Sequence, residues 1–238
     1  MMNKSYVYPD YNDKITITMI DEKESVKGIG YWQRSEKRIL NLMKKQIEKH
    51  IKKDNTWFLD AGCGDGRLLP EFEKYFDNIL LIDPDIERLK SAKRLINRLD
   101  LSKKVKCKTL SIGSIKSKQK FDVILCNHVL QHVHTDNIKK FLEKFYELLN
   151  KDGLLFITTC NSTKKEDYFV KQYIKNSKTI EEIIKKEEFN SLVYNEKLLP
   201  IHFLNKDKLI SLLKSLNFKV LDLKKFHINR DIFIALTK

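Results

Sequence analysis

Residues Trp57–Leu69 read W-F-L-D-A-G-C-G-D-G-R-L-L, and this stretch decides the fold. Its first three residues are apolar or aromatic, which is typical of a buried parallel strand. An acid, Asp60, follows them, and three glycines then stand at alternate positions. Apolar residues next recur on one helical face, at Leu69, Phe72 and Phe76. The stretch therefore predicts a strand, a glycine turn and a helix in direct succession.

Such a turn favours the binding of a ligand. Glycine has no Cβ, so a ligand can approach the backbone closely, and the helix start offers N–H groups and a partial positive charge. The spacing here is G-x-G-x-G, whereas the dinucleotide fingerprint is G-x-G-x-x-G. Arg67 stands where that fingerprint needs its last glycine. The pattern therefore argues against a nicotinamide-dependent dehydrogenase.

Length and composition are those of one globular α/β domain or two small ones, with 238 residues and 42% hydrophobic residues. No run of about 18 apolar residues predicts a transmembrane helix. Residues 1–6 lack the apolar segment of a secretory signal. The four cysteines form no C-x-x-C pair, so they predict reduced thiols and no zinc motif. These features predict a cytoplasmic protein without a membrane partner.

The formal net charge of +14 leaves two interpretations open. An acidic partner such as RNA, a phosphorylated metabolite or anionic lipid would account for it. Solvated, lysine-rich helix faces would account for it equally. The basic residues are scattered and interleaved with acids, so we favour the second interpretation. Nucleic acid remains an alternative partner.

The next strand also ends in an acid. Residues Asn78–Asp83 form a short apolar run, and a helical pattern follows it. Asp85 is placed to cap that helix, which leaves Asp83 for another role. Nucleoside-binding α/β folds place a carboxylate about 20 residues after the glycine turn, where it accepts the ribose hydroxyl protons. We therefore predict that Asp83 contacts a ribose.

The rest of the chain continues the α/β alternation. Strands are predicted at 105–110, 121–127, 154–159, 218–223 and 231–237, and helices from Ser35, over 136–149 and after Asn205. Residues 1–31 predict an irregular arm with one short strand at 15–20. Residues 161–204 interrupt the alternation and are predicted as two helices, one around Tyr168–Ile174 and one capped by Thr179 with Glu182.

Two motifs carry a resemblance to the class I S-adenosylmethionine-dependent methyltransferases of small-molecule type. The glycine stretch resembles motif I, a hydrophobic run followed by D-x-G-x-G-x-G. Phe121-Asp122, with Val129-Leu130-Gln131-His132 after it, resembles the later F-D…V-L-x-H pattern. The order of elements also agrees from about residue 36 onward. The resemblance implies a Rossmann-like, seven-stranded mixed sheet with helices on both faces. It divides the chain into an arm and lid helix (1–50) and a core (51–238) with an inserted helical cap (161–204).

The resemblance also implies a set of residues that bind S-adenosylmethionine. Gly62, Gly64 and Gly66 would border its methionine part, and Asp60 would orient its ammonium group. Asp83, followed by Pro84, would hold the ribose. Ser111, Ile112 and Asn127 would surround the adenine or the sulfonium, although Ser111 stands where the family often has an acid. Arg34 would bind the carboxylate of the cofactor or an acidic substrate, or else is a solvated charge at a helix start.

Two histidines are the candidate catalytic residues, His128 and His132, which lie four residues apart after the fourth strand. A base is needed only if the acceptor loses a proton. The histidine at 132 matches the family pattern, in which it is often structural. The spacing would also suit a metal, but no third ligand is evident nearby, and no metal is predicted.

The acceptor is narrowed mainly by exclusion. Asn127-His128-Val129-Leu130 stands where an N-P-P-(Y/F) motif would shape a slot for a flipped base, and no Pro-Cys nucleophile is present. The prediction is methyl transfer to an oxygen or nitrogen of a small molecule. Two alternatives remain: a tRNA or protein methyltransferase, and a non-catalytic subunit that binds a partner. The oligomeric state is left open.

Overall fold

The computed structural model describes residues 29–238 except 53, 117, 176–177, 194–198 and 227–228. The predicted arm and its strand at 15–20 lie outside the described residues. Helix α3 spans Ile29–His50 and so begins before Ser35. Its residues Ile39, Met43 and Ile47 are buried, as their spacing predicts. Within the described residues, no helix is long and apolar enough to cross a membrane.

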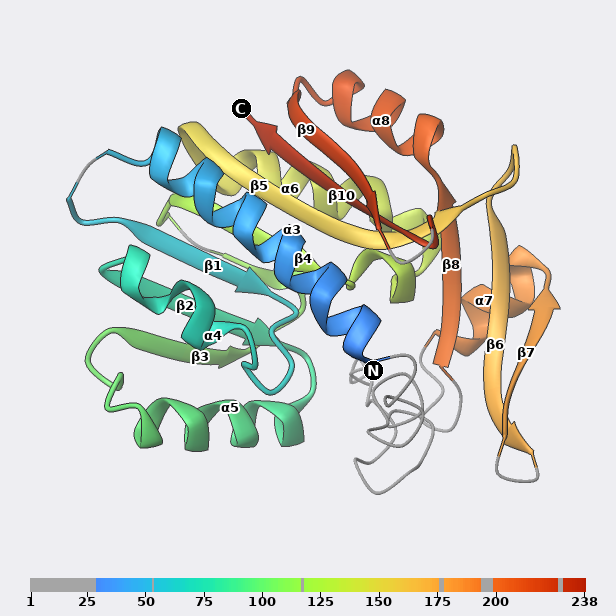
Figure 1. The fold of residues 1–238 in the computed structure, drawn as a ribbon, viewed down its shortest axis with the longest axis horizontal. Coiled ribbons are helices and arrows are strands. Elements are labelled where there is room, and N and C mark those ends of the chain that lie inside the picture. The colour runs from blue at the N-terminus through green and yellow to red at the C-terminus, as the bar shows by residue number, and fades with distance from the viewer. Residues whose placement is uncertain (1–28, 53, 117, 176–177, 194–198, 227–228) are drawn as a thin grey trace.

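A parallel sheet forms the centre of the molecule (Figure 1). Its first strands are β1 (Trp57–Ala61), β2 (Asn78–Asp83), β3 (Val105–Thr109), β4 (Phe121–Asn127) and β5 (Leu149–Ser162). They stand in the order β3-β2-β1-β4-β5. The central strands are apolar and almost fully buried, because helices cover both faces of a parallel sheet. The carboxyl ends of β1, β2 and β4 therefore meet at one edge.

Two antiparallel strands complete a seven-stranded core. β10 (Asp231–Thr237) pairs with β5, and β9 (Lys219–Phe226) pairs with β10. β5 begins at Leu149, before the predicted strand at 154–159, and its pairing with β4 is irregular over residues 150–153. In the β4–β5 ladder, Phe121 pairs with Leu149, and Val123 pairs with Leu154. Residues 150–153 therefore have no partner in this ladder. The predicted fold class, a Rossmann-like mixed sheet, is confirmed.

Helices cover the two faces of this sheet as two separate layers. One layer holds α3, α4 (Leu69–Phe72) and α5 (Ile86–Arg98), which pack on Phe58, Leu81 and their neighbours. The other holds α6 (Ile138–Leu148) and α8 (Lys206–Ser215), which pack on Leu59, Ile82 and their neighbours. In Figure 1 α3 crosses the near face of the sheet, and α6 lies behind it.

The segment 161–204 differs from the prediction. It contains β6 (Tyr168–Lys175), β7 (Lys178–Ile184), the short helix α7 (Lys186–Leu192) and β8 (Leu199–Asn205). The predicted pair of helices is wrong, because the aromatic and β-branched residues there pair across strands. β6 pairs antiparallel with both β7 and β8, and β8 joins the far end of β5. The inserted element is therefore a β-hairpin with one short helix, beyond the end of β5 (Figure 1).

Candidate active site

The glycine turn follows β1 at the carboxyl edge of the sheet. The backbone N–H groups of Gly62 and Cys63 donate to the carbonyl of Ile82, at 2.8 and 3.0 Å, and so fix the turn against β2. Gly62 has a φ of 88°, and a Cβ there would lie 2.4 Å from a methyl carbon of Val129. Glycine is required at this position by both its conformation and its surroundings.

Asp83 is buried at the end of β2 and is held in place by the turn. Its Oδ2 accepts from the N–H of Gly64 at 2.8 Å, and its Oδ1 accepts from the N–H of Asp85 at 2.9 Å. Asp85 caps α5 by accepting from the N–H groups of Glu87 and Arg88, which confirms its predicted role as the N-cap. Each Asp83 oxygen thus holds one backbone donor and can accept another. A ligand that offers two adjacent hydroxyl groups suits this carboxylate.

Asp60, near the end of β1, is also buried. Burial, first, and the nearby Asp83 carboxylate raise the pKa of Asp60 to about 7. Burial likewise raises the pKa of Asp83, against the lowering effect of its two N–H donors. Two buried carboxylates side by side disfavour each other's charge. A ligand with a cationic group would relieve that cost.

Two arginine side chains border the turn, and the sequence predicts a site role only for the first, Arg67, as a partner of the cofactor carboxylate. Arg67 makes a two-pronged ion pair with Glu36 of α3, with Nη1–Oε2 and Nη2–Oε1 distances of 3.0 and 2.6 Å. This pair fixes α3 to the glycine turn, so Arg67 serves this contact. Arg88 of α5 lies against Gly64, where an added Cβ would come 2.8 Å from its Nη1. Arg34 lies within α3, and its predicted contact stays a prediction.

The predicted adenine side lies at the ends of β3 and β4. Ser111 Oγ and Ser114 Oγ share a hydrogen bond of 2.8 Å, and Ile112 between them is buried. Asn127, the last residue of β4, accepts from Thr158 Oγ1 through its Oδ1 at 2.6 Å. Pro84, after β2, is half-buried. The four predicted residues lie at the carboxyl edge of the sheet, where Asp60 and Asp83 also lie. They are Pro84, Ser111, Ile112 and Asn127.

His128 and His132 are joined through Gln131. His132 Nδ1 lies 2.9 Å from the carbonyl oxygen of Pro200, and this nitrogen must be the donor. Its Nε2 therefore accepts from Gln131 Nε2 at 3.2 Å. Gln131 Oε1 in turn accepts from His128 Nδ1 at 3.2 Å. The chain of bonds fixes one tautomer for each ring, with the lone pair of His128 on Nε2.

Burial keeps both rings neutral. It lowers the pKa of His132 to about 4, and it also lowers the pKa of His128. His132 uses both ring nitrogens to hold β8 and Gln131, which favours the structural interpretation weighed above. Gln131 was not singled out from the sequence, although it stands inside the V-L-x-H pattern. The direction of the hydrogen bond between Gln131 and His132 is set by the carbonyl oxygen of Pro200, which is 68 residues away from His132 along the chain.

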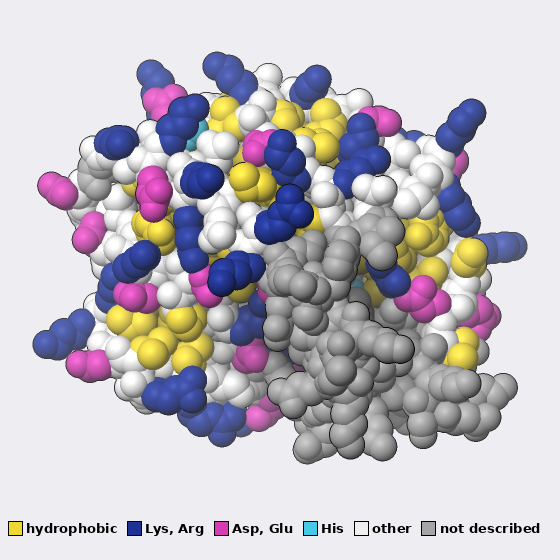
Figure 2. All heavy atoms as spheres, in the orientation of Figure 1, with side chains coloured by type: hydrophobic (Ala, Val, Ile, Leu, Met, Phe, Trp, Pro, Cys, Tyr) yellow, Lys and Arg dark blue, Asp and Glu magenta, His cyan; other side chains and the backbone are white. Residues whose placement is uncertain are grey.

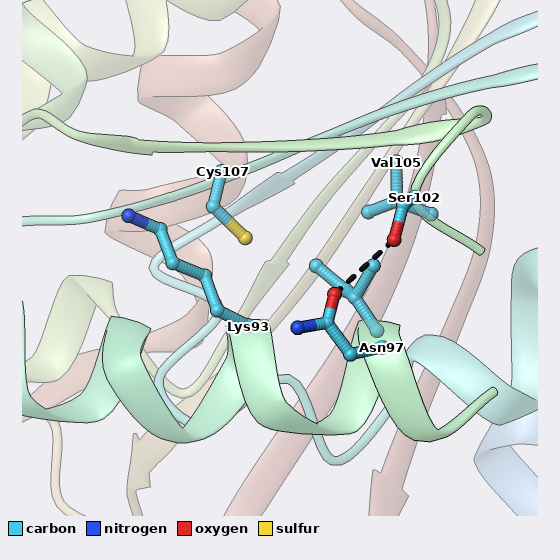
Figure 3. A pocket seen from close by; sticks show the side chains of 6 residues that line it. Lys93, Asn97, Ser102, Val105 and Cys107 are labelled. Carbon is cyan, nitrogen blue, oxygen red and sulfur yellow. Dashed lines mark hydrogen bonds between the residues drawn. The ribbon is translucent and has the colours of Figure 1, made fainter. Parts of the chain in front are cut away.

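A pocket toward the amino edge of the sheet contains none of the candidate site residues. It lies between the second half of α5 and the start of β3, and Figure 3 shows it. Its lining residues are Lys93, Ile96, Asn97, Ser102, Val105 and Cys107. Ser102 Oγ donates to Asn97 Oδ1 at 3.1 Å across its mouth. These residues lie toward the amino end of β3, away from the glycine turn, and are not part of the candidate site.

The geometry is that of an α/β protein with a glycine turn and two buried carboxylates, Asp60 and Asp83, at the carboxyl edge of its sheet. A family model described as a methyltransferase domain matches residues 31–223. The chain therefore belongs to the methyltransferase domain family. This confirms the resemblance to S-adenosylmethionine-dependent methyltransferases that motif I indicates.

Individual relatives agree with this assignment. The ubiquinone biosynthesis O-methyltransferase of Pelagibacter ubique is 34% identical over 115 residues, which are 48% of this chain and 46% of that protein. The mitochondrial enzyme of the same name from Bos taurus is 32% identical over 110 residues, 44% of this chain and 29% of that protein. The matched stretch thus spans less than half the length of these relatives.

Solved structures share the fold at low sequence identity. An S-adenosylmethionine-dependent methyltransferase from Clostridium acetobutylicum superposes with a TM-score of 0.63 and 14% identity, covering 84% of this chain and 91% of that one. The 1,6-didemethyltoxoflavin-N1-methyltransferase of Burkholderia thailandensis gives a TM-score of 0.61 at 17% identity, with 94% and 88% covered.

Proposed function

We propose that the protein transfers a methyl group from S-adenosylmethionine to an oxygen or nitrogen of a small-molecule acceptor. The observation that carries the proposal is Asp83. This buried carboxylate is held by two backbone N–H groups beside a glycine turn, and each of its oxygens can accept a further hydrogen bond from one hydroxyl group of a vicinal diol. Membership of the methyltransferase domain family supports the same activity. Similarity to ubiquinone O-methyltransferases favours a hydroxyl group as the acceptor.

The residues at the carboxyl edge fit this cofactor. Asp83 would accept hydrogen bonds from both ribose hydroxyl groups. The buried Asp60, with its raised pKa, would pair with the ammonium group. Gly62, Gly64 and Gly66 would let the methionine part approach the backbone. The adenine would lie near Ser111 and Ile112, with Asn127 toward the sulfonium.

Methyl transfer from a sulfonium requires the protein mainly to position the reactants. The bound cofactor supplies a methyl group on a sulfonium that its own positive charge already activates. The acceptor atom forms a bond to that carbon while the carbon–sulfur bond breaks, so the chain has to align the acceptor and exclude water. His128 remains the predicted base for an acceptor that must lose a proton, because its fixed tautomer places a lone pair on Nε2. We infer that α3 and the β6–β8 insertion cover the acceptor.

Surface charge supports a small acceptor over a nucleic acid. Figure 2 shows lysine and arginine side chains spread over this face among acidic and apolar ones. Many of the lysines have acidic partners, for example Lys44 with Glu71 and Lys171 with Glu188. A cytoplasmic location stays a prediction, as does the partner-binding alternative.

Calorimetric titration with S-adenosylmethionine and S-adenosylhomocysteine tests the proposal. We expect micromolar affinity in the wild type and a loss of about 100-fold in Asp83→Ala, because charge-assisted hydrogen bonds to the ribose disappear. Asp122→Ala is the matched control, since Asp122 is equally buried but binds Trp57 N–H at the opposite edge. Failure of the wild type to bind either compound would refute the proposal. There would then be no reason to search metabolite pools for an acceptor that takes up a labelled methyl group.

A further inference from the structure

Three side chains with metal-ligand chemistry lie together at the carboxyl ends of β4 and β5. They are His128, Cys160 and Asp231, and one donor atom from each lies within 4.8 Å of the other two. Cys160 and Asp231 are direct partners in the β5–β10 ladder, and both are buried. We propose that this cluster binds one divalent transition-metal ion of the zinc class.

The donor set favours this class of ion. A thiolate is a soft ligand, an imidazole is intermediate and a carboxylate is hard, a combination that suits Zn²⁺ or Co²⁺ and disfavours Mg²⁺ and Ca²⁺. Binding replaces the Cys160 S–H bond with a sulfur–metal bond and releases the proton to solvent. One thiolate and one carboxylate then balance the two charges of the ion. Neutrality matters here because an uncompensated charge in a buried site is costly.

Gln131 supplies the support that such a site needs. Its Oε1 accepts from the backbone N–H of Cys160 at 2.9 Å and from His128 Nδ1 at 3.2 Å. One amide oxygen thus positions two of the three ligands. Metal-binding histidines usually donate their second ring N–H to a fixed acceptor, which orients the ring. The bond to Gln131 leaves the lone pair on Nε2, so this is the nitrogen that can bind the metal.

The backbone of His128 is also held in an unusual conformation. Its φ is 55°, in the left-handed region, which is unfavourable for a residue with a Cβ. Its N–H is anchored by the carbonyl oxygen and the Oγ1 of Thr158, at 2.9 and 3.0 Å. Strain of this kind persists where the surroundings fix it, often at functional sites. Here it places the imidazole near Cys160 and near Asp231, the first residue of β10.

The site would lie beside the expected position of methyl transfer. Three protein ligands leave a fourth position of a tetrahedral ion for water or another small ligand. A His128 ring that binds the metal has no lone pair for a base, so the two roles exclude each other. The proposed methyl transfer does not depend on which role His128 takes.

Cobalt titration tests the site directly. The protein is treated with a chelator, dialysed and titrated with Co²⁺ alone. We expect one equivalent to produce a near-ultraviolet thiolate-to-cobalt charge-transfer band. Cys160→Ser should abolish that band, and Asp231→Asn should weaken Co²⁺ binding at least tenfold. Cys107→Ser is the matched control, because Cys107 lies in the pocket of Figure 3 and should leave the band unchanged.

A second measurement uses only the wild type, so it does not depend on how a variant folds. X-ray absorption at the zinc edge of the protein loaded with one equivalent should show one sulfur ligand at about 2.3 Å among nitrogen and oxygen ligands. A shell without sulfur, no charge-transfer band, or a band that survives Cys160→Ser would overturn the proposal. Titration with S-adenosylhomocysteine on the same samples reports separately on the proposed function.

Discussion

Aspartates are buried at both edges of the central sheet, but we assign them to stability at the amino edge and to ligand binding at the carboxyl edge. At the amino edge, Asp122 accepts from the N–H of Trp57 at 2.8 Å and from Asn150 Nδ2 at 2.6 Å, and so links the starts of β1, β4 and β5. At the carboxyl edge, Asp60 and Asp83 lie close enough to disfavour each other's charge. The chain pairs both oxygens of Asp122, whereas burial raises the pKa of both carboxyl groups at the carboxyl edge, which are the ones proposed to bind the ligand.

The largest effect should come from the turn that shapes the carboxyl edge. Gly62→Ala puts a Cβ into the side chain of Val129 at a φ of 88°, which should lower the free energy of unfolding by about 3 kcal/mol. S-adenosylhomocysteine affinity should fall at least tenfold, because the turn must move. The measurements are urea unfolding and calorimetry.

Gly113→Ala is the control for that substitution. A Cβ at Gly113 would lie 3.2 Å from the ring edge of Phe141, and its φ is not in the left-handed region. We expect a loss of less than about 1 kcal/mol and unchanged affinity. Equal effects of the two substitutions would contradict the requirement for glycine at position 62.

The amino edge should respond in stability alone. Asp122→Ala leaves the N–H of Trp57 and the amide of Asn150 without this acceptor, which should lower the free energy of unfolding by about 2–3 kcal/mol. Affinity for S-adenosylhomocysteine should stay within twofold of the wild type. A large loss of affinity in a variant that remains folded would show that the two edges are coupled.

Asp60 should make ligand binding depend on pH. Its carboxyl group has a pKa of about 7 in the folded protein, and a bound ammonium group favours the ionised form. Affinity for S-adenosylhomocysteine should therefore fall by up to about tenfold per pH unit below about 7. Calorimetry from pH 5 to 8 measures this dependence, and Asp60→Asn should flatten it.

The same group gives an opposite trend in the stability of the unliganded protein. A carboxyl group whose folded pKa is raised stabilises the fold fully below its unfolded value of 3.8, and that contribution is lost as pH rises through about 7. Relative to Asp60→Asn, the wild type should therefore lose stability between about pH 4 and 7. A constant difference across this range would mean that Asp60 ionises normally.

The sequence predicted the parts of the fold that local patterns determine. The glycine turn, the cap at Asp85 and the two acids at strand ends lie within short stretches, and their chemistry is visible in the residues themselves. The prediction of two helices in the inserted segment was wrong, because the structure of this segment depends on pairing between strands. Phe169 and Ile184 are neighbours through β6 and β7, and Phe169 also pairs with His202 of β8. The same apolar residues suit a helix when the pairing is unknown.

The candidate site divides in the same way. Asp60, the glycines and Asp83 are close in sequence, and the structure brings them to one edge. The proposed metal cluster joins His128, Cys160 and Asp231, which the pairing of β5 with both β4 and β10 brings together. Glu36 is likewise brought to Arg67 by the packing of α3. Contacts of this kind leave no local signal, so sequence reasoning could not assign them.

The smallest effect should come from that ion pair between α3 and the turn. Glu36→Gln should lower the free energy of unfolding by only about 0.5–1 kcal/mol, because one partner is substantially exposed and water screens the pair. The loss should shrink in about 0.5 M salt, where the Debye length falls to a few ångströms. Glu87→Gln is the control, since its pair with Lys90 is exposed on both sides and should contribute less. If Glu36→Gln also weakened S-adenosylhomocysteine binding more than about twofold, the pair would be holding α3 over the ligand rather than only onto the fold. That result would extend the functional edge of the sheet to include α3, and an unchanged affinity would confine it to the strand ends.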